Sequence, residues 1–406
     1  MKWATYTMQE LINEISMGPF GSDIKKSVYT NSGVPVLNGA NLQGFTLKEN
    51  TFGYVSEEKA DSLKKCNAHR GDIIVTHRGT LGQIVYIPNN SLFERYVISQ
   101  SQFRFNLKPE LARAEFIVYY FHTREGQHKI LSNASQVGVP ALARATTTFR
   151  QLEVKVPPLP VQDKIVGILS ALDSKIENNN KINGNLEAQA EALFKSWFVD
   201  FTPFKDQPFV DSELGPIPQG WKVGKLGDIA LQSTEKVLTR NDVKVLSPIT
   251  TGKLVLSEEY FTKQVFSKSI RNYKIVKQGA FAYNPARVNI GSLGMNEFKF
   301  DGCVSPVYVV FECLKGYSFF FDLFRKTEFF KQAVISFAIG GVRQTLNYSD
   351  FALIDVTIPP LNIVQSFNEI YLHLKKKISI NEEENQRLAA LRDTLLPKLM
   401  SGEIKL

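Results

Sequence analysis

The sequence has few cysteines, few histidines and no long apolar run, and each shortage excludes a class of protein. The three cysteines, Cys66, Cys303 and Cys313, lie far apart and form no CxxC pair. This argues against a disulfide scaffold, a redox motif and a cysteine-based metal site. No apolar run approaches the roughly 20 residues that span a bilayer, and the N-terminus lacks the apolar core of a signal peptide. We therefore expect a cytoplasmic protein without a metal site.

Catalytic signatures are missing as well. The sequence contains no Gly-x4-Gly-Lys-Ser/Thr phosphate loop and no glycine-rich dinucleotide turn after a strand, and its five histidines form no HExxH motif. Tyr283-Asn284-Pro285-Ala286 resembles part of the Asn-Pro-Pro-aromatic signature of amino-methyltransferases, but the second proline and the aromatic residue are absent. A simple turn is the preferred interpretation. We predict no catalytic residue, no cofactor and no enzymatic activity of the chain itself.

The composition is that of an ordinary globular protein with a basic surplus. The chain has 406 residues, of which 43% are hydrophobic and 22% charged, with a net charge of +8. That length suffices for two or three domains. The surplus lies in two segments, with 18 basic and 13 acidic residues in 1–157 and 19 and 15 in 201–358. Such a balance is compatible with a polyanionic partner, although ordinary surface charge would also produce it.

An internal repeat with a shift of 202 residues sets the architecture. Residues 149–159, FRQLEVKVPPL, align with residues 351–361, FALIDVTIPPL. Each copy alternates apolar and polar residues before a Pro-Pro pair, which is typical of a half-buried strand that ends at the prolines. Weaker echoes link residues 71–75 with 279–283 and residues 97–99 with 303–305. We expect two modules with related scaffolds.

After each Pro-Pro pair the apolar spacing changes to alternating fours and threes, which predicts a long helix with a coiled-coil seam. About 39 residues at 1.5 Å per residue would make a helix of about 58 Å. The predicted seam positions of the two copies are Val161, Ile165, Ile168, Leu172, Ile176, Leu186, Leu193 and Trp197, and Ile363, Phe367, Ile370, Leu374, Ile378, Leu388, Leu395 and Leu399.

Four asparagines occupy positions of the seams that should be apolar: Asn179 and Asn183 in the first copy, Asn381 and Asn385 in the second. A buried asparagine penalises any register that leaves its amide unpaired, so these residues are predicted to fix the register. The alternative is a loop at residues 177–180 that splits the first segment into two shorter helices, and Gly184 would favour such a break.

These patterns predict an α+β protein with four segments. Two globular modules, residues 1–157 and 201–358, would be in a pseudo-twofold arrangement and separated by two long antiparallel helices that form a coiled coil. The helices would occupy residues 158–200 and 359–406. A proline-rich stretch at about residues 201–220 would link the first helix to the second module.

Several loops combine glycine or serine with cationic and amide side chains, a composition suited to phosphate contacts. Arginine can also read guanine, and asparagine or glutamine can read adenine, through two hydrogen bonds. A solvated surface residue is the simpler interpretation of any one of them. The candidate DNA-binding residues are Lys25, Lys26, His77, Arg78 and Thr80 in the first module, and Arg287, Asn289, Arg343 and Gln344 in the second.

The whole pattern resembles the specificity subunits of type I restriction-modification systems. Further stretches that carry the resemblance are residues 18–22, GPFGS, residues 33–37, GVPVL, and residues 157–162, PPLPVQ. Residues 212–221, SELGPIPQGW, and residues 391–402, LRDTLLPKLMSG, extend it over nearly the whole chain. The resemblance implies that each module is a target recognition domain for one half of a bipartite DNA site, and that the helices set the spacing.

The resemblance also implies partners. Two methyltransferase subunits would dock on the helices, and motor-nuclease subunits would join through that complex. The aromatic end of the first long segment, Phe194, Trp197 and Phe198, is a candidate docking site, with burial against the second module as the alternative. Two other functions remain open, a coiled-coil scaffold whose modules bind proteins and a lone DNA methyltransferase. Salt-sensitive DNA binding would favour the recognition role over the scaffold.

Overall fold

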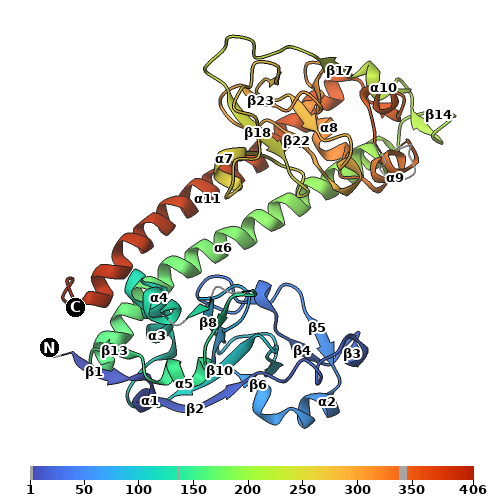
Figure 1. Ribbon diagram of the computed structural model, residues 1–406. Helices are drawn as coiled ribbons and strands as arrows, with labels where there is room; N and C mark the ends of the chain where they lie inside the picture. The colour runs from blue at the N-terminus through green and yellow to red at the C-terminus, as the bar shows by residue number, and fades with distance from the viewer. Residues whose placement is uncertain (1–2, 133, 136–137, 338–344) are drawn as a thin grey trace. The chain divides into compact units, whose positions relative to one another are not determined.

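The computed structural model describes residues 3–132, 134–135, 138–337 and 345–406. The chain forms two compact units (Figure 1). Unit 1 comprises Met1–Asn179 with Glu383–Leu406, and unit 2 comprises Asn180–Glu382. Both boundaries fall inside the long helices, so each unit contains one globular module and half of each helix. In the described part of the chain, no helix is long and apolar enough to cross a membrane.

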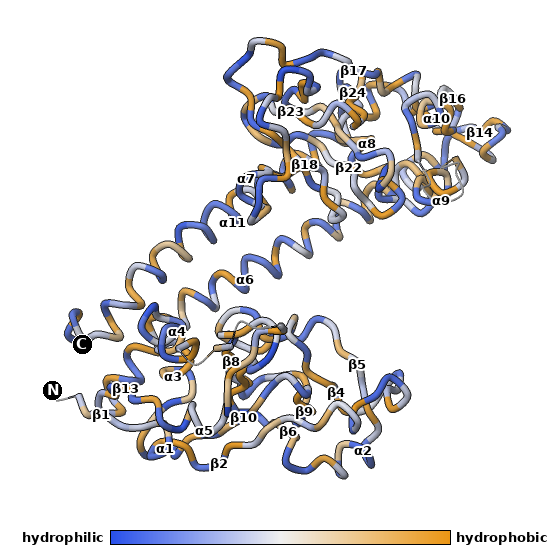
Figure 2. The backbone as a smooth tube through the Cα atoms, in the orientation of Figure 1, coloured by the Kyte–Doolittle hydropathy of each residue, from blue (hydrophilic) through white to orange (hydrophobic). Residues whose placement is uncertain are grey.

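The two long helices are continuous. Helix α6 (Leu159–Phe198) has 40 residues and helix α11 (Leu361–Ser401) has 41. Gly184 lies inside α6, and the alternative of a loop at residues 177–180 is therefore wrong. Figure 2 shows both helices alternating between hydrophilic and hydrophobic residues along their length, which is typical of a helix with one buried face.

Within unit 1 the two helices run antiparallel. The Asn179 side-chain amide donates to Asn385 Oδ1 at 2.9 Å and to Glu384 Oε2 at 2.7 Å. Nearer the start of α6, Asp173 accepts from Arg392 Nη1 at 2.7 Å. Higher numbers on one helix thus face lower numbers on the other, as the sequence predicted.

Within unit 2 the helices are antiparallel as well. Asn381 Nδ2 donates to Asn183 Oδ1 at 2.7 Å, and both side chains are buried. Farther along α6, the Phe198 ring lies 4.9 Å from the Phe367 ring of α11. All four predicted asparagines therefore take part in contacts between the helices. Their proposed role in fixing the register remains a prediction.

The predicted seam is wrong by one residue at the same place in both copies. Ile168 and Ile370 are 37% and 43% exposed, whereas the next residues, Leu169 and Tyr371, are buried. Leu169 and Tyr371 belong to the cores of unit 1 and unit 2, respectively. A strict coiled-coil spacing considers only the partner helix, but here each helix also packs on a module, and that larger contact decides which side faces inward.

The module of unit 1 contains two sheets. The first has the antiparallel order β2-β10-β7-β8, and the second has the order β3-β5-β4-β9-β6, in which β4 and β9 are parallel. The strands of the first sheet are β2 (Ile12–Met17), β10 (Gln102–Leu107), β7 (Ile73–Thr76) and β8 (Ile84–Tyr86), and those of the second are β3 (Tyr29–Thr30), β5 (Gly53–Val55), β4 (Val34–Val36), β9 (Arg95–Val97) and β6 (Asn67–His69).

The module of unit 2 repeats this topology, except that β3 has no counterpart among the described strands of its second sheet. Its sheets have the orders β17-β24-β21-β22 and β19-β18-β23-β20, and β18 and β23 are again parallel. The sequence echoes at residues 71–75 and 279–283 lie at β7 and β21, and those at 97–99 and 303–305 begin in β9 and β23, so the repeat is confirmed. The strands are β17 (Ala230–Ser233), β24 (Val309–Cys313), β21 (Phe281–Tyr283), β22 (Leu293–Met295), β19 (Leu254–Leu256), β18 (Lys244–Pro248), β23 (Gly302–Val304) and β20 (Lys274–Val276).

The strands that precede the Pro-Pro pairs form as predicted. Strand β13 (Glu153–Val156) pairs antiparallel with β1 (Ala4–Thr7), and β25 (Asp355–Ile358) pairs antiparallel with β16 (Lys222–Lys225). Proline cannot donate to a ladder, so each strand stops there and the chain enters its long helix.

Short helices and hairpins complete the modules. The stretch between α6 and β16 is not a bare linker, because it holds the 3-10 helix η4 (Thr202–Phe204) and a hairpin of β14 (Phe209–Val210) and β15 (Ile217–Pro218). The other elements are α1 (Met8–Leu11), η1 (Lys26–Val28), η2 (Gly39–Asn41), α2 (Glu57–Ser62), η3 (Lys64–Cys66), α3 (Ala114–His122), α4 (Arg124–Leu131), β11 (Ala134–Ser135), β12 (Ala141–Leu142), α5 (Ala145–Arg150), η5 (Leu226–Asp228), α7 (Ser257–Tyr260), η6 (Val288–Ile290), α8 (Ser318–Phe324), α9 (Glu328–Phe337) and α10 (Tyr348–Ala352).

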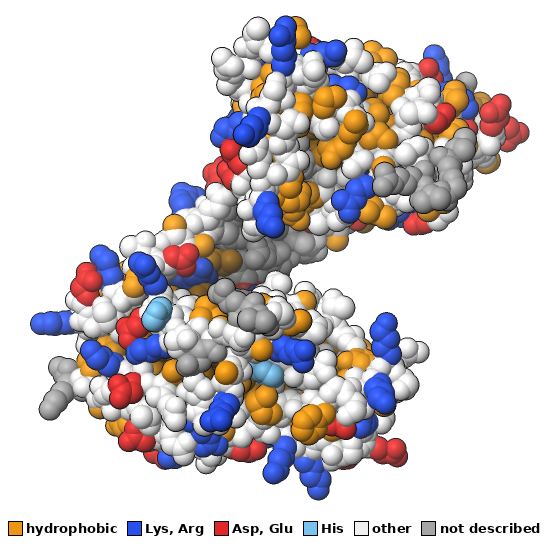
Figure 3. All heavy atoms as spheres, in the orientation of Figure 1, with side chains coloured by type: hydrophobic (Ala, Val, Ile, Leu, Met, Phe, Trp, Pro, Cys, Tyr) orange, Lys and Arg blue, Asp and Glu red, His pale blue; other side chains and the backbone are white. Residues whose placement is uncertain are grey.

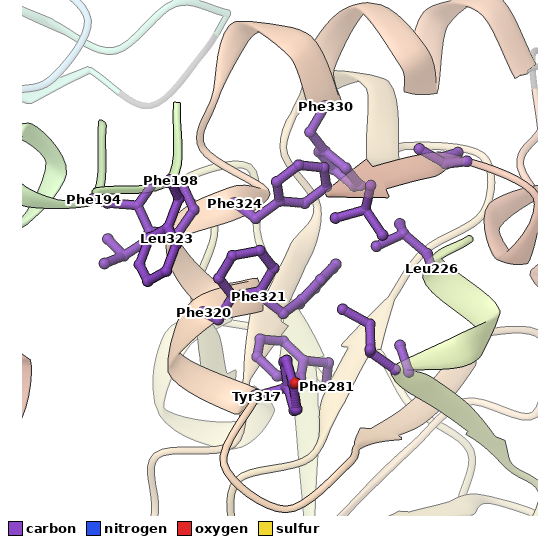
Figure 4. Packing of buried hydrophobic residues seen from close by; sticks show 14 of the residues in the cluster. Phe194, Phe198, Leu226, Phe281, Tyr317, Phe320, Phe321, Leu323, Phe324 and Phe330 are labelled. Carbon is purple, nitrogen blue, oxygen red and sulfur yellow. The ribbon is translucent and has the colours of Figure 1, made fainter. Parts of the chain in front are cut away.

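An aromatic cluster forms the core of unit 2 (Figure 4). The Phe281 and Phe311 rings of neighbouring strands are stacked at 5.2 Å, and Phe321 of α8 meets Phe281 edge-on at 4.9 Å. Phe194 and Phe198 extend this cluster from α6 and are buried. Aromatic rings bury large areas, so this packing fixes α6 firmly on the module. The α+β fold class with two modules and long helices is thus confirmed.

Candidate nucleic-acid interface

The loop at His77–Thr80 is the hairpin that joins β7 to β8 in unit 1. Its backbone is held by two hydrogen bonds, from Gly79 N to Pro140 O at 2.9 Å and from Leu142 N to His77 O at 2.8 Å. Gly79 has a φ of +90°, which a side chain would disfavour. The side chains of Arg78 and Thr80 are exposed. A fixed backbone therefore presents a cationic and a hydroxyl side chain to solvent.

The second predicted loop, residues 18–26, follows β2 and rests on residues 99–102. Gly18 N donates to Gln102 O at 2.8 Å, and a Cβ at Gly18 would lie 2.0 Å from Ser99 O. A Cβ at Gly21 would lie 2.2 Å from Gln100 Oε1. The glycines thus let the loop lie close against residues 99–102. At Gly18 any larger residue would force the backbone to move. Lys25 and Lys26 follow at the start of η1, and both are exposed.

The two loops meet at a pocket of ≈ 950 Å³ in unit 1. His77 and Arg78 of the first loop and residues 18–21 and 23 of the second line it. Lys25, Lys26 and Thr80 are not part of the lining, although Lys25 is only two residues beyond Asp23. A volume of that size accepts a small ligand or one part of a larger one. The other lining residues are Ser16, Met17, Asp61, Ser62, Leu63, Lys64, Lys65, Cys66 and Gln100.

The charges around this pocket favour an anion. Lys64, Lys65 and Arg78 are exposed. The two acidic residues of the lining already have partners, since Asp61 pairs with Arg95 at 2.7 Å and Asp23 Oδ2 accepts from Phe20 N at 3.2 Å. Figure 3 shows Lys and Arg side chains scattered over the visible face of unit 1, with Asp and Glu side chains between them. The surface is therefore moderately basic.

His77 is half-buried beneath this surface. Burial lowers the pKa of His77 below its ordinary value, and the nearby charge of Arg78 acts in the same direction. Nε2 of the neutral ring lies 3.2 Å from the Gln100 carbonyl oxygen. At neutral pH the ring joins the hairpin to Gln100, which also lies against Gly21 of the second loop, and the positive charge comes from the lysines and Arg78.

A buried ion pair holds the turn that carries Lys64 and Lys65. Arg104 of β10 donates to Asp72 Oδ2 at 3.2 Å and to Glu14 Oε1 at 2.7 Å. Its Nε also donates to the backbone carbonyl of Lys65 at 3.1 Å. Desolvation raises the pKa of Asp72, and the charge of Arg104 opposes that shift. The guanidinium thus ties the sheet to the turn that carries Lys64 and Lys65.

Unit 2 presents the equivalent hairpin, which joins β21 to β22. Arg287 and Asn289 are exposed on it. Its base is fixed because Ser292 Oγ donates to Pro248 O at 2.8 Å, and a Cβ at Gly291 would lie 2.5 Å from Thr250 O. Since β7-β8 and β21-β22 are equivalent strand pairs, Arg78 and Arg287 occupy corresponding loops. The predicted Arg343 and Gln344 lie outside the described residues.

The candidate docking residues are mainly core residues. Phe194 and Phe198 are buried in unit 2 and Trp197 is partly buried, as the alternative interpretation expected. Phe194 and Phe198 nevertheless reach the floor of a second pocket of ≈ 520 Å³, whose lining includes the exposed Val199 and Phe329.

Sequence reasoning missed Phe20, Lys64, Lys65 and Gln100. Phe20 stood inside a quoted stretch but was not selected, and Lys64-Lys65 was a dibasic pair that could have been. No local pattern links residue 20 to residues 64 and 100, because the sheet brings them together. Within the described ranges, no group of three or more His, Cys, Asp or Glu could hold a metal ion.

The fold and the candidate interface define a class of protein with two modules that repeat one topology. Each module carries an exposed arginine on the equivalent hairpin. Residues 2–188 match the family described as "Type I restriction modification DNA specificity domain". Over these residues the chain is similar to the specificity subunits of type I restriction-modification systems.

Relatives extend the match over most of the chain. The MjaIX specificity subunit of Methanocaldococcus jannaschii is 28% identical over 86% of this chain and 81% of its own length. The HindI specificity subunit of Haemophilus influenzae is 22% identical over 82% of this chain and 87% of its own length. The crystal structure of a type I S subunit from M. genitalium has a TM-score of 0.58 at 15% identity and covers 98% of this chain and 96% of that one. That similarity concerns the fold.

Proposed function

We propose that the chain is the DNA recognition subunit of a type I restriction-modification complex and that each module reads one half of a bipartite site. One observation carries the proposal: topologically equivalent hairpins expose Arg78 in unit 1 and Arg287 in unit 2, with different neighbours. Arginine can form two hydrogen bonds with guanine. Equivalent loops with different side chains are suited to two different half-sites.

The other predicted residues fit this division of labour. Thr80 and Asn289 lie on the same hairpins and are suited to base edges, whereas Lys25 and Lys26 are suited to phosphates. We include Arg343 and Gln344 among the candidate base contacts on sequence grounds. The long helices would set the distance between the readers, with the asparagine pairs fixing their register. Action on chromosomal DNA would place the protein in the cytoplasm.

Selection from random duplex DNA tests this function. We expect the full chain to enrich two short motifs with a constant spacing, and retention to fall steeply as salt rises. Exchange of residues 1–150 for another module is expected to change one motif only. Enrichment of no motif would contradict DNA recognition and favour a protein-binding scaffold, and a change in both motifs would contradict independent reading.

We also propose that two methyltransferase subunits dock on the helices, and that these subunits supply the chemistry and recruit the motor-nuclease subunits. Ile168 of α6 and Ile370 of α11 are exposed 202 residues apart at equivalent repeat positions. A single exposed apolar side chain is common on a protein surface, but here the same exposure recurs at the equivalent position of both helices. Such equivalence suits two copies of one partner. Other exposed apolar residues of the helices are Ile182, Leu361, Leu372, Ile380 and Leu391.

Single substitutions test the docking sites. We expect Ile168→Asp and Ile370→Asp each to reduce the assembly from two methyltransferase subunits per chain to one, since a buried unpaired carboxylate costs about 3–5 kcal/mol at an interface. Multi-angle light scattering of the mixed proteins measures this. Two subunits retained by both variants would contradict the assignment. Unchanged melting of each variant alone provides the folding control.

A further inference from the structure

Phe20 is the most exposed large apolar side chain among the residues that the structure describes, with 81% of its surface open to solvent. It lies at the edge of the pocket of unit 1, beside Met17, which is also exposed. A hydrophobic ring in this position costs solubility and contributes nothing to the core. Its side chain is therefore available to a partner that binds at this pocket.

The backbone around Phe20 is ordered before any ligand arrives. Phe20 N donates to Asp23 Oδ2 at 3.2 Å, and Asp23 N donates to Phe20 O at 2.9 Å. Pro19 is buried, and Gly18 is bonded to Gln102. Because the loop is already fixed, presenting the ring to a partner carries little additional entropic cost.

The charged side chains around Phe20 indicate what kind of partner would contact the ring. Lys64, Lys65 and Arg78 line the same pocket, and the nearby carboxylates of Asp23 and Asp61 are engaged with Phe20 N and Arg95. The lining holds three cationic side chains and two carboxylates, and an aromatic ring beside this positive surplus matches a ligand with both flat apolar faces and negative charges. Duplex DNA offers base stacks bordered by phosphates.

We propose that Phe20 is a wedge residue that inserts its ring between base pairs at the half-site bound by unit 1. This inference rests on the proposed DNA recognition. Phe and Leu side chains can partly unstack a base step and kink the duplex, while nearby cations hold the phosphates. The wedge would favour steps that unstack easily, so it would contribute to sequence preference without a hydrogen bond to a base.

Unit 2 carries an independent counterpart. Leu238 follows β17 as Phe20 follows β2, and these two strands are equivalent in the repeated sheets. It is 56% exposed, and its φ of +51° is strained for leucine. Its backbone N–H donates to Arg271 O at 2.9 Å, and Lys236 beside it is exposed. Each unit thus presents one apolar side chain from the loop after its first sheet strand.

The experiment uses the full chain and duplexes selected by it from a random pool, with 2-aminopurine placed at successive positions of each half-site. Unstacking raises the fluorescence of this base. We expect an increase at one step next to each half-site, and Phe20→Ala is expected to abolish it in one half only. The loss of stacking is expected to weaken binding about 5- to 150-fold. Because no charge changes, the salt dependence should remain that of the unaltered chain.

Matched variants separate a wedge from a general effect. Phe20→Trp is expected to retain the increase in 2-aminopurine fluorescence. Leu92→Ala removes a 71% exposed side chain outside the pocket, and it is expected to change neither this fluorescence nor the affinity for the duplex. Equal fluorescence and affinity for Phe20→Ala and the unaltered chain would overturn the wedge and leave DNA recognition intact. Failure of the unaltered chain to prefer any duplex would contradict the proposed function itself. A Phe20→Ala defect confined to capture of a protein partner would also overturn the wedge.

Discussion

Arg104→Met is expected to destabilise unit 1 by about 3–5 kcal/mol, because it removes the charged partner of Asp72 in the interior and leaves that carboxylate with neutral donors such as the His69 backbone N–H. Both side chains are buried, with Nη1 and Oδ2 3.2 Å apart. Hydrogen exchange of the β10 and β7 amides, followed by mass spectrometry, measures the loss unit by unit, with the β24 amides of unit 2 as an internal reference.

The pH dependence of this loss of stability follows from the titration of Asp72. Desolvation already raises its pKa, and removal of Arg104 deletes an interaction that lowers it. A carboxyl whose pKa is higher in the folded state binds protons more tightly there, so the ionised form opposes folding. We expect the deficit of Arg104→Met to be greatest above the folded pKa of Asp72 and to shrink as the pH falls through that value toward the unfolded pKa. A deficit that grows on acidification would contradict this cause.

Two further variants define the controls. Arg104→Met combined with Asp72→Asn removes both charges and is expected to restore part of the stability. Arg240→Met in unit 2 removes a guanidinium that pairs with Asp242 at 2.6 Å and Asp301 at 3.1 Å, but that side chain is one-third exposed. The expected cost there is much smaller, because water screens an exposed ion pair. Equal costs at Arg104 and Arg240 would show that burial does not govern the first result.

Sequence periodicity predicted the regular elements because their causes are local. The Pro-Pro pairs end β13 and β25 through missing N–H donors, and the apolar spacing after them marks α6 and α11. Which side of each helix faces inward depends on a module that is distant in sequence. That is why the seam included Ile168 and missed Leu169.

The candidate interface could be predicted from the sequence only in part, for the same reason. Glycine-rich loops with arginine and lysine can be recognised locally, and both predicted loops of the first module lie at one pocket. The convergence of residues 20, 64 and 100 needs the strand order β2-β10-β7-β8 and the turn that Arg104 holds. Antiparallel pairing between segments about 90 residues apart leaves no periodic signal in one sequence.

Replacement of Lys25, Lys26, Lys64 and Lys65 by glutamine is expected to weaken DNA binding about 10³- to 10⁴-fold at 0.1 M salt. Each lysine that neutralises a phosphate contributes about 0.9 to the slope of log affinity against log salt, so four contacts lower the slope by about 3.6. All four side chains are exposed, and the change reduces the net charge from +8 to +4. Fluorescence anisotropy with the selected duplex across a salt series measures both effects.

The same four positions changed to arginine provide the charge-matched control. That variant is expected to keep both affinity and slope, because arginine retains the positive charge that displaces counterions. The glutamine variant is expected to lose affinity equally for its selected duplex and for random DNA, since phosphate contacts carry no sequence information. A selective loss for the selected duplex alone would assign base reading to these lysines and not to Arg78. An unchanged slope would place the duplex elsewhere on unit 1, and the pocket would then lose its role at the interface.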